Sequence, residues 1–222
     1  FLVTPTPGTR NSAGLQAALT ETVVFSRAAG PFSTPFTLTL SGAAAGQDIR
    51  YVLVAPSATG TAAPDPTATS TKYTGPLTID SSVFVKAAVF TADASNRGTA
   101  SRTHYVKIGG TTATDLVNFS SNLPVLLLDN HGAGPLKKDL VDHEGWLYRY
   151  PAKSPAAPAL AGPPDVSVPV TLTVRGSSSA GFPKKSYSLE LGSPTGGKSA
   201  LPLVGSVASK KWALIGPWYF DQ

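Results

Sequence analysis

Basic residues surround a serine-rich turn in the last third of the sequence, where the chain is best equipped to hold an anion. The set comprises Arg175, Gly176, Ser177, Ser178, Lys184 and Lys185. Glycine permits a tight backbone in which amide N–H groups face an anion, and fixed cations hold phosphate groups. This segment is therefore a candidate phosphate-binding site.

The two lysines of this set differ in the strand face that they occupy. In the strand expected over 184–191, Lys185 shares the apolar face with Tyr187 and Leu189, whereas Lys184 lies on the polar face. A lysine on an apolar face must extend its ammonium group to water or contact an anion. Two interpretations stay open: Lys185 or Arg175 contacts phosphate, or these cations serve structural ion pairs.

A second group of residues has the chemistry of metal ligands. It comprises Asp129, His131, Asp142, His143 and Glu144. Their spacing fits no recognised ligand frame, and the nearby glycines indicate a turn. We therefore expect a solvated loop and predict no metal site. A structural role is also predicted for His104, which lies beside Tyr105 in an expected strand.

The segment GSPTGGKS (192–199) satisfies the pattern G-x-x-x-x-G-K-S of a phosphate-binding loop. Such a loop must open a helix whose N-terminus faces the phosphates. The following residues, ALPLVGSV, place Pro202 and Gly205 in what would be the first turns. A hairpin loop between two strands is therefore the preferred interpretation.

The composition is that of a β-rich protein. The 222 residues include 21 glycines and 20 prolines, too many for long helices, and 41% are hydrophobic, too many for a disordered chain. No apolar run approaches the roughly 18–20 residues of a membrane helix. The net charge of +5 is scattered along the chain, so nucleic-acid binding is not expected. The absence of cysteine excludes disulfides and thiolate sites.

Short strands with period-2 patterning are expected over 21–108, typical of an antiparallel sandwich. They are FTLTL (36–40), IRYVLV (49–54), LTI (77–79), VFVKAAVF (83–90) and a last strand within 100–108. Residues 1–20 are interpreted as a linker or the tail of a preceding domain, and residues 109–122 as a hinge. The first residue is not Met, and this favours a processed chain or a piece of a longer protein.

A second β-rich unit is predicted over 123–222, with no segment of helical periodicity. Its strands are LPVLLLD (123–129), WLYRY (146–150), VSVPVTLTV (166–174), KKSYSLEL (184–191) and KWALIG (211–216). The first is a continuous apolar run, as expected of a strand buried on both faces. Pro169 interrupts the third and indicates an edge strand or a bulge.

Residues 25–108 resemble the chitobiase/β-hexosaminidase C-terminal type of Ig-like module. The matching segments are GPFSTPFTLTLS (30–41), IRYVL (49–53), PDPT (64–67), KYTGPLTI (72–79) and VFVKAAVF (83–90). The loop 55–71 is longer than the family's usual form. The resemblance implies an Ig-like β-sandwich without catalytic residues, which accompanies other domains in secreted or surface proteins.

Residues 123–222 are similar to the N-terminal part of the CotH family of atypical protein kinases. The matches are VRGSSSAGFPKKSYSLEL (174–191) and KKWALIGPWYFDQ (210–222), and TPTPGTRN (4–11) resembles the closing turn of lamin-tail domains. The resemblance implies a twisted, mainly antiparallel sheet, as an incomplete kinase-like N-lobe. For the complete domain it implies ATP and Mg²⁺, with the candidate set around Arg175 contacting the nucleotide.

Two functions are weighed on this basis. In the first, the chain is a fragment of a secreted or cell-surface multi-domain bacterial protein with an ATP-dependent kinase domain. Its catalytic aspartates would lie downstream, so no catalytic residue is predicted in the fragment. In the second, the protein is a structural or adhesive surface protein whose kinase-like lobe is only a scaffold. Expected partners are the downstream lobe, surface proteins or glycans, and further copies through an exposed sheet edge.

Overall fold

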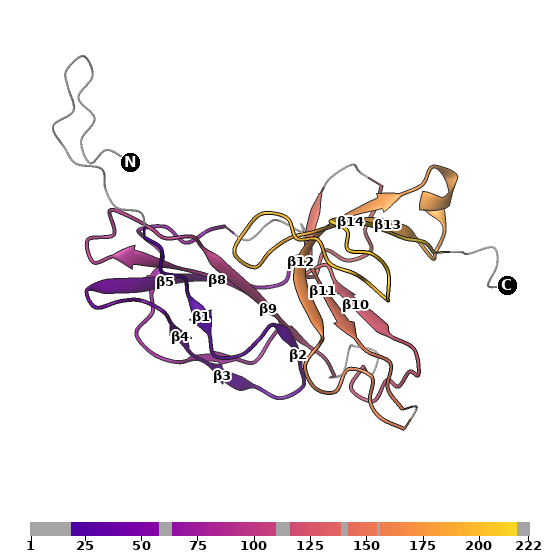
Figure 1. Ribbon diagram of the computed structural model, residues 1–222, viewed down its shortest axis with the longest axis horizontal. Helices are drawn as coiled ribbons and strands as arrows, with labels where there is room; N and C mark the ends of the chain where they lie inside the picture. Colours follow the sequence, from indigo (N-terminus) through magenta and orange to yellow (C-terminus); the bar gives the residue numbers. More distant parts are fainter. Residues whose placement is uncertain (1–18, 58–63, 110–115, 139–141, 155, 217–222) are drawn as a thin grey trace, which may run out of the picture.

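The computed structural model describes residues 19–57, 64–109, 116–138, 142–154 and 156–216, and their regular structure is almost entirely β-strand (Figure 1). Within these ranges the single helical element is a 3₁₀ turn, η1 (Ser178–Gly181). The predicted mostly β fold, with mainly antiparallel sheets, is confirmed. No described helix has the length and hydropathy that crossing a bilayer requires.

The first unit is a β-sandwich. Its strands are β1 (Val24–Phe25), β2 (Gly30–Phe32), β3 (Phe36–Leu38), β4 (Leu40–Ser41), β5 (Gln47–Val54), β6 (Thr71–Lys72), β7 (Leu77–Ile79), β8 (Val83–Thr91) and β9 (Ser101–Lys107). One layer has the order β2-β9-β8-β5-β6, and the pairs β1-β4 and β3-β7 form the other. The pair β2-β9 is parallel, and the other pairs are antiparallel. All five strand segments expected from the sequence are present.

Strand β8 is buried on both of its faces. Its odd-numbered residues, from Val83 to Val89, join the core between the two layers. Phe84 lies on the other face, where it belongs to a separate buried cluster. A strand of a free-standing sandwich would expose this second face to water, so the pattern requires something to cover it.

The second unit is a five-stranded antiparallel sheet in which the strands follow one another in chain order. They are β10 (Val125–Asp129), β11 (His143–Tyr150), β12 (Val166–Arg175), β13 (Ser186–Leu191) and β14 (Lys211–Leu214). The even-numbered residues of β12 from Val168 to Val174 enter its core together with Leu189 and Leu191 of β13. The predicted strand over 166–174 is therefore present, with one apolar face. Strand β10 lies at the sheet edge and is half-buried rather than fully covered.

Strand β12 is a central strand of the sheet, and its register with β11 runs through Pro169 without a bulge. The ladder with β13 begins only at Val170, so Pro169 lies at a local edge on that side, although β12 is not an edge strand. The carbonyl of Pro169 accepts a hydrogen bond from the Gly192 amide at 2.8 Å, just beyond the end of β13. In an antiparallel ladder the N–H and C=O of a residue point to the same neighbouring strand. The N–H that proline lacks would therefore face Gly192, beyond the end of the β12–β13 ladder, and no hydrogen bond within that ladder is missing.

The two units lie side by side, with β8 and β9 directed toward β11 and β12 (Figure 1). The core of the sandwich contains residues up to Tyr105, and the core of the five-stranded sheet contains residues from Leu126 onward. In the segment interpreted as a hinge, residues 110–115 lie outside the described ranges, while Leu116 and Val117 pack against the buried cluster around Phe84. The domain boundaries and the hinge stay predictions.

Candidate functional site

A third buried cluster joins the two units, and we call it the seam. It comprises Phe84, Ile108, Trp146, Tyr148, Tyr150 and Leu160. The alternation of β11 explains how three aromatic residues reach it: they point to one face, while Leu147 between them points into the core of the five-stranded sheet. The seam thus covers the second face of β8.

Two histidines and an aspartate meet at the seam, and we call them the His–Asp–His cluster. His104 lies on β9, Asp129 ends β10, and His131 follows in a turn with a φ of 53°. His104 Nε2 lies 3.2 Å from Asp129 Oδ2 and 3.3 Å from His131 Nδ1. One potential ligand atom from each residue lies within 4.8 Å of the others.

The remaining polar atoms of the two histidines contact neighbours of fixed position. His104 Nδ1 lies 2.8 Å from the Tyr148 hydroxyl oxygen, and that hydroxyl donates to the His104 carbonyl at 2.9 Å. His131 Nε2 lies 3.0 Å from the carbonyl oxygen of Val54 on β5. The His131 amide donates to Asp129 Oδ2 at 3.1 Å. Both rings are therefore held in one orientation.

An apolar shell surrounds the cluster and changes its acid–base behaviour. Phe84 contacts both imidazoles, at centroid distances of 4.3 Å and 4.2 Å, and Trp146 stacks on His104. Burial, with the neighbouring His131, lowers the pKa of His104 to about 3, and burial also lowers the pKa of His131. Burial raises the pKa of Asp129, although the His131 amide opposes that shift. Charged forms of these side chains are thus disfavoured in the folded protein.

The expectation of a solvated loop over Asp129–Glu144 is wrong for its first part. His131 is buried, and Asp129 exposes only 23% of its side chain. Asp142 is exposed as expected, and Glu144 forms an ion pair with Arg102 at 3.0 Å. The sequence argument failed because it considered neighbours along the chain, whereas His104 arrives from the other unit.

The six residues of the candidate phosphate-binding set lie around the connection between β12 and β13, where Arg175 pairs with Ser186. Arg175 ends β12 with an exposed side chain, and Ser177 and Ser178 are exposed after it. Gly176 has a φ of 102°, and a Cβ there would collide with the Ser179 hydroxyl, so this turn requires glycine. Whether the amide groups of this turn face an anion stays a prediction.

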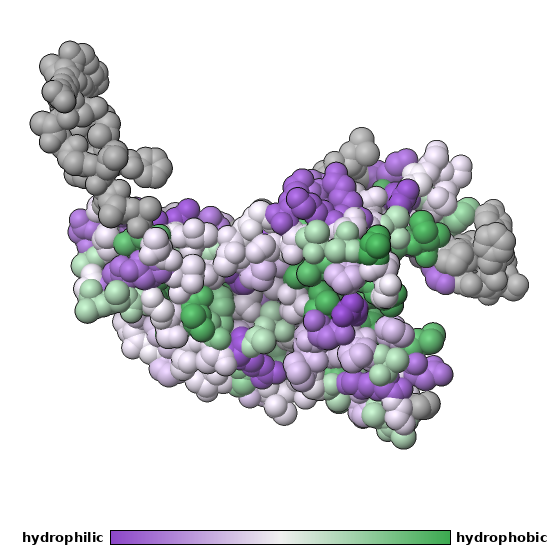
Figure 2. All heavy atoms as spheres, in the orientation of Figure 1, coloured by the Kyte–Doolittle hydropathy of each residue, from purple (hydrophilic) through white to green (hydrophobic). Residues whose placement is uncertain are grey.

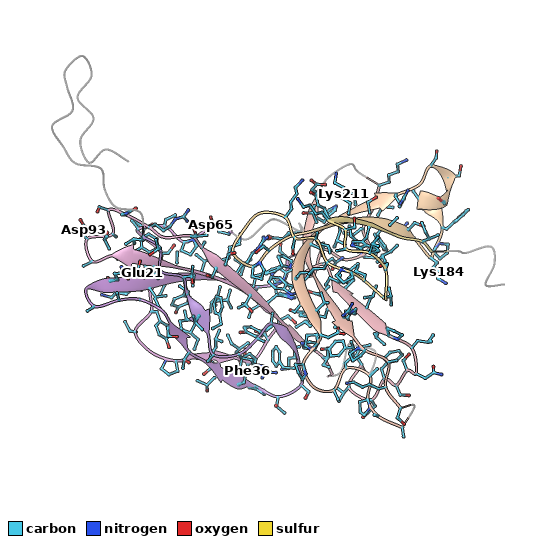
Figure 3. All side chains as sticks on the ribbon, viewed as in Figure 1. Glu21, Phe36, Asp65, Asp93, Lys184 and Lys211 are labelled. Carbon is cyan, nitrogen blue, oxygen red and sulfur yellow. The ribbon has the colours of Figure 1, made fainter. Side chains whose placement is uncertain are left out.

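The lysines of that set have different environments. The Lys185 ammonium donates to the Ala180 carbonyl at 2.7 Å and so braces the turn around η1. Lys184 is exposed, and Figure 3 shows it at one end of the five-stranded sheet, away from Lys211 in that view. This contact gives Lys185 a structural role, which was one of the two interpretations of the sequence. The assignment of these residues to nucleotide binding stays a prediction.

A polar pocket of about 590 Å³ lies on the face of the five-stranded sheet opposite its core. Its polar lining consists of Asp142, Thr171, Thr173, Arg175, Ser188, Glu190 and Lys211. Hydrophilic residues gather near β14 in the space-filling view (Figure 2). Arg175 and Lys211 are cations that fit a phosphate group. Of the two carboxylates in this lining, Glu190 is paired with Lys198 and Lys211, and Asp142 is exposed.

The segment 192–199 forms the predicted hairpin loop. Gly192 and Lys198 are bridged as antiparallel partners, and the Ser193 amide donates to the Gly197 carbonyl. No helix follows within the described residues, so the phosphate-binding-loop pattern is accidental here. Trp212 packs against the core of its sheet, whereas Trp218 and Tyr219 lie outside the described residues.

Comparison of the chain with protein-family models, with curated proteins and with solved structures finds no match. The resemblances to the Ig-like module and to the CotH family therefore stay predictions.

Proposed function

We propose that this chain is a structural part of a secreted or cell-surface multi-domain bacterial protein, in which the sandwich and the five-stranded sheet act as one rigid spacer. The observation that supports this function best is the seam. Phe84 of the sandwich and Trp146, Tyr148 and Tyr150 of the sheet are all buried there. Units joined by a flexible tether bury far less apolar surface between them.

Polar contacts across the same boundary support rigidity as well. The Arg102 guanidinium of β9 contacts both Glu144 of β11 and the carbonyl of Ser193, and the Arg102 amide donates to the Pro194 carbonyl. The Ser57 amide donates to the His131 carbonyl. Contacts at several separate places fix rotation as well as distance, which is what a spacer between other domains needs.

Calorimetric unfolding tests the rigid spacer. The wild-type chain is expected to unfold in one transition, because loss of either unit exposes the seam. Phe84→Ala removes a fully buried ring at the boundary and should separate the transition into two. Leu38→Ala is the matched control: it is buried within the sandwich alone, and should lower the unfolding temperature while keeping one transition. Two transitions in the wild type would refute the proposal.

The second candidate function is nucleotide binding, as the CotH resemblance implies for the complete domain. Arg175 and Lys211 at the polar pocket support it, because two cations beside the hydroxyl groups of Thr173 and Ser188 suit phosphate oxygens. The carboxylates for Mg²⁺ and the phosphoacceptor would come from the expected downstream lobe. The extracellular location and the bacterial source rest on the same resemblance.

Titration with ATP, in the presence and absence of Mg²⁺, tests this second function. Arg175→Ala is expected to weaken binding by about tenfold, the equivalent of one charge-assisted contact. Lys107→Ala, an exposed cation on the sandwich, should leave the affinity unchanged. Lys185→Ala distinguishes its two roles: unchanged ATP affinity with reduced stability would leave Lys185 purely structural. No ATP binding by the wild-type chain would remove Arg175 and Lys211 from the proposal.

A further inference from the structure

The His–Asp–His cluster has a hydrogen-bond arrangement that leaves three lone pairs facing one another. A carbonyl oxygen can only accept, so the single proton of the Tyr148 hydroxyl goes to the His104 carbonyl. The contact between His104 Nδ1 and the same hydroxyl oxygen then requires the ring nitrogen to donate. A neutral His104 therefore carries its proton on Nδ1 and a lone pair on Nε2.

The same reasoning fixes the second histidine. His131 Nε2 lies 3.0 Å from the Val54 carbonyl oxygen and must donate to it, so a neutral His131 has its lone pair on Nδ1. That atom faces His104 Nε2 at 3.3 Å, and Asp129 Oδ2 faces His104 Nε2 at 3.2 Å. Three acceptors at such distances repel one another unless a shared proton or a metal cation lies between them.

Two of the three distances between the ligand atoms fit a transition-metal ion, and the third, between Asp129 and His131, is within 4.8 Å. Zn²⁺ binds imidazole nitrogen and carboxylate oxygen at about 2.0–2.2 Å in tetrahedral geometry, which places neighbouring ligand atoms about 3.3 Å apart. Both contacts of His104 Nε2 have this length. The opposite nitrogen of each histidine is held by a hydroxyl or carbonyl oxygen, the outer-shell arrangement that orients metal-bound imidazoles.

We propose that His104 Nε2, His131 Nδ1 and Asp129 Oδ2 bind one divalent transition-metal ion of the zinc class at the seam. The partly exposed side of Asp129 leaves the fourth position to water. The site takes one ligand from the sandwich, one from the end of β10 and one from the turn after it, so the ion cross-links the units. This role is independent of the rigid spacer, which the apolar seam supports without metal.

Zinc binding to the whole chain tests the site. The protein is prepared without a histidine tag, stripped with a chelator, and titrated with Zn²⁺ by calorimetry, with Mg²⁺ as a comparison ion. One Zn²⁺ per chain, a rise in unfolding temperature and no response to Mg²⁺ are expected. Asp129→Asn should weaken Zn²⁺ binding by about tenfold or more. His143→Gln removes the third histidine of the chain, which lies outside the cluster, and should leave binding unchanged.

A second measurement needs no variant and covers the case in which Asp129→Asn fails to fold. Co²⁺ replaces Zn²⁺ and reports its own geometry, because four-coordinate Co²⁺ absorbs visible light far more strongly than the hydrated ion. The chain has no cysteine, so a strong band would come from nitrogen and oxygen ligands. Absence of Zn²⁺ binding by the wild type, or binding that His143→Gln abolishes, would overturn the proposal.

Discussion

Two tyrosines of β11 differ in what their buried hydroxyl groups contact. The Tyr148 hydroxyl donates to the His104 carbonyl, whereas the Tyr150 hydroxyl is buried without a hydrogen-bond partner among the described residues. Tyr148→Phe should therefore lower the free energy of unfolding by about 1–3 kcal/mol, since it leaves buried groups unpaired. Tyr150→Phe should leave it unchanged or raise it. Urea unfolding followed by circular dichroism measures both, and equal losses would contradict the assigned contacts.

The buried histidines predict that acid destabilises the metal-free protein. His104 has a folded pKa of about 3, while an unfolded histidine binds a proton near pH 6.5. Between these values the unfolded state binds more protons, so stability present at neutral pH is lost as the pH falls. His131 acts in the same direction, because its pKa is lowered as well.

Asp129 opposes this effect. Its folded pKa is raised, so its contribution is present at low pH and is lost as the pH rises through that pKa. The urea midpoint of chelator-treated wild type should still fall between pH 7 and pH 4.5, because both histidines outweigh one carboxyl group. His104→Gln should show a smaller fall. An equal fall in the variant would mean that His104 is not the responsible group.

Residue types alone pointed to part of the cluster, but the sequence argument rejected it as a metal site. Asp129 ends an apolar strand and His131 follows two residues later, so both were visible as possible ligands in the sequence. His104 lies on the other unit, and its approach depends on how two sheets pack. No spacing along the chain encodes that packing, so the complete cluster could not be predicted.

Strand β11 contains a position where only glycine fits. A Cβ on Gly145 would lie 2.5 Å from the Asp129 carbonyl oxygen and 2.8 Å from the Leu172 side chain. Gly145→Ala should therefore push β10 away from β11 and lower the free energy of unfolding by about 1–3 kcal/mol. Gly181→Ala, where a Cβ meets nothing within 4 Å, is the matched control. Amide hydrogen exchange should localise the loss to β10, and similar stability of the two variants would refute the crowding.

Long strands were predictable from the sequence, and strands formed by short local pairing were not. Strands β5, β8, β9 and β12 have seven to ten residues, and each lies where expected. Strands of two or three residues, such as β1 and β2, carry too few side chains for a pattern, and tertiary contacts create them. Pro169 was informative only locally: β12 is a central strand, but its ladder with β13 begins after the proline.

At the scale of the whole molecule, the sequence predicted two β-rich units but not how closely they join. The alternation of β11 gives two apolar faces, Leu147 on one and Trp146 and Tyr148 on the other. Such a pattern predicts that both faces of the strand are buried, but it does not identify the element that covers each face. The structure supplies β8 of the sandwich as that cover, which is information that exists only once both sheets have formed.

The strongest polar link across the seam gives the last prediction. Arg102 Nη1 lies 3.0 Å from Glu144 Oε1, and the two side chains expose 21% and 13% of their surface. Partial burial strengthens such a pair relative to one in water. A double-mutant cycle with Arg102→Gln and Glu144→Gln should therefore give a coupling energy of about 0.5–3 kcal/mol in urea unfolding. The matched control is the pair Lys72–Asp48 within the sandwich, at 2.8 Å but with Lys72 52% exposed, for which less than about 1 kcal/mol is expected. A coupling no larger than that of the control would mean that Arg102 and Glu144 do not hold the two units together, and the seam would then depend on its aromatic residues alone.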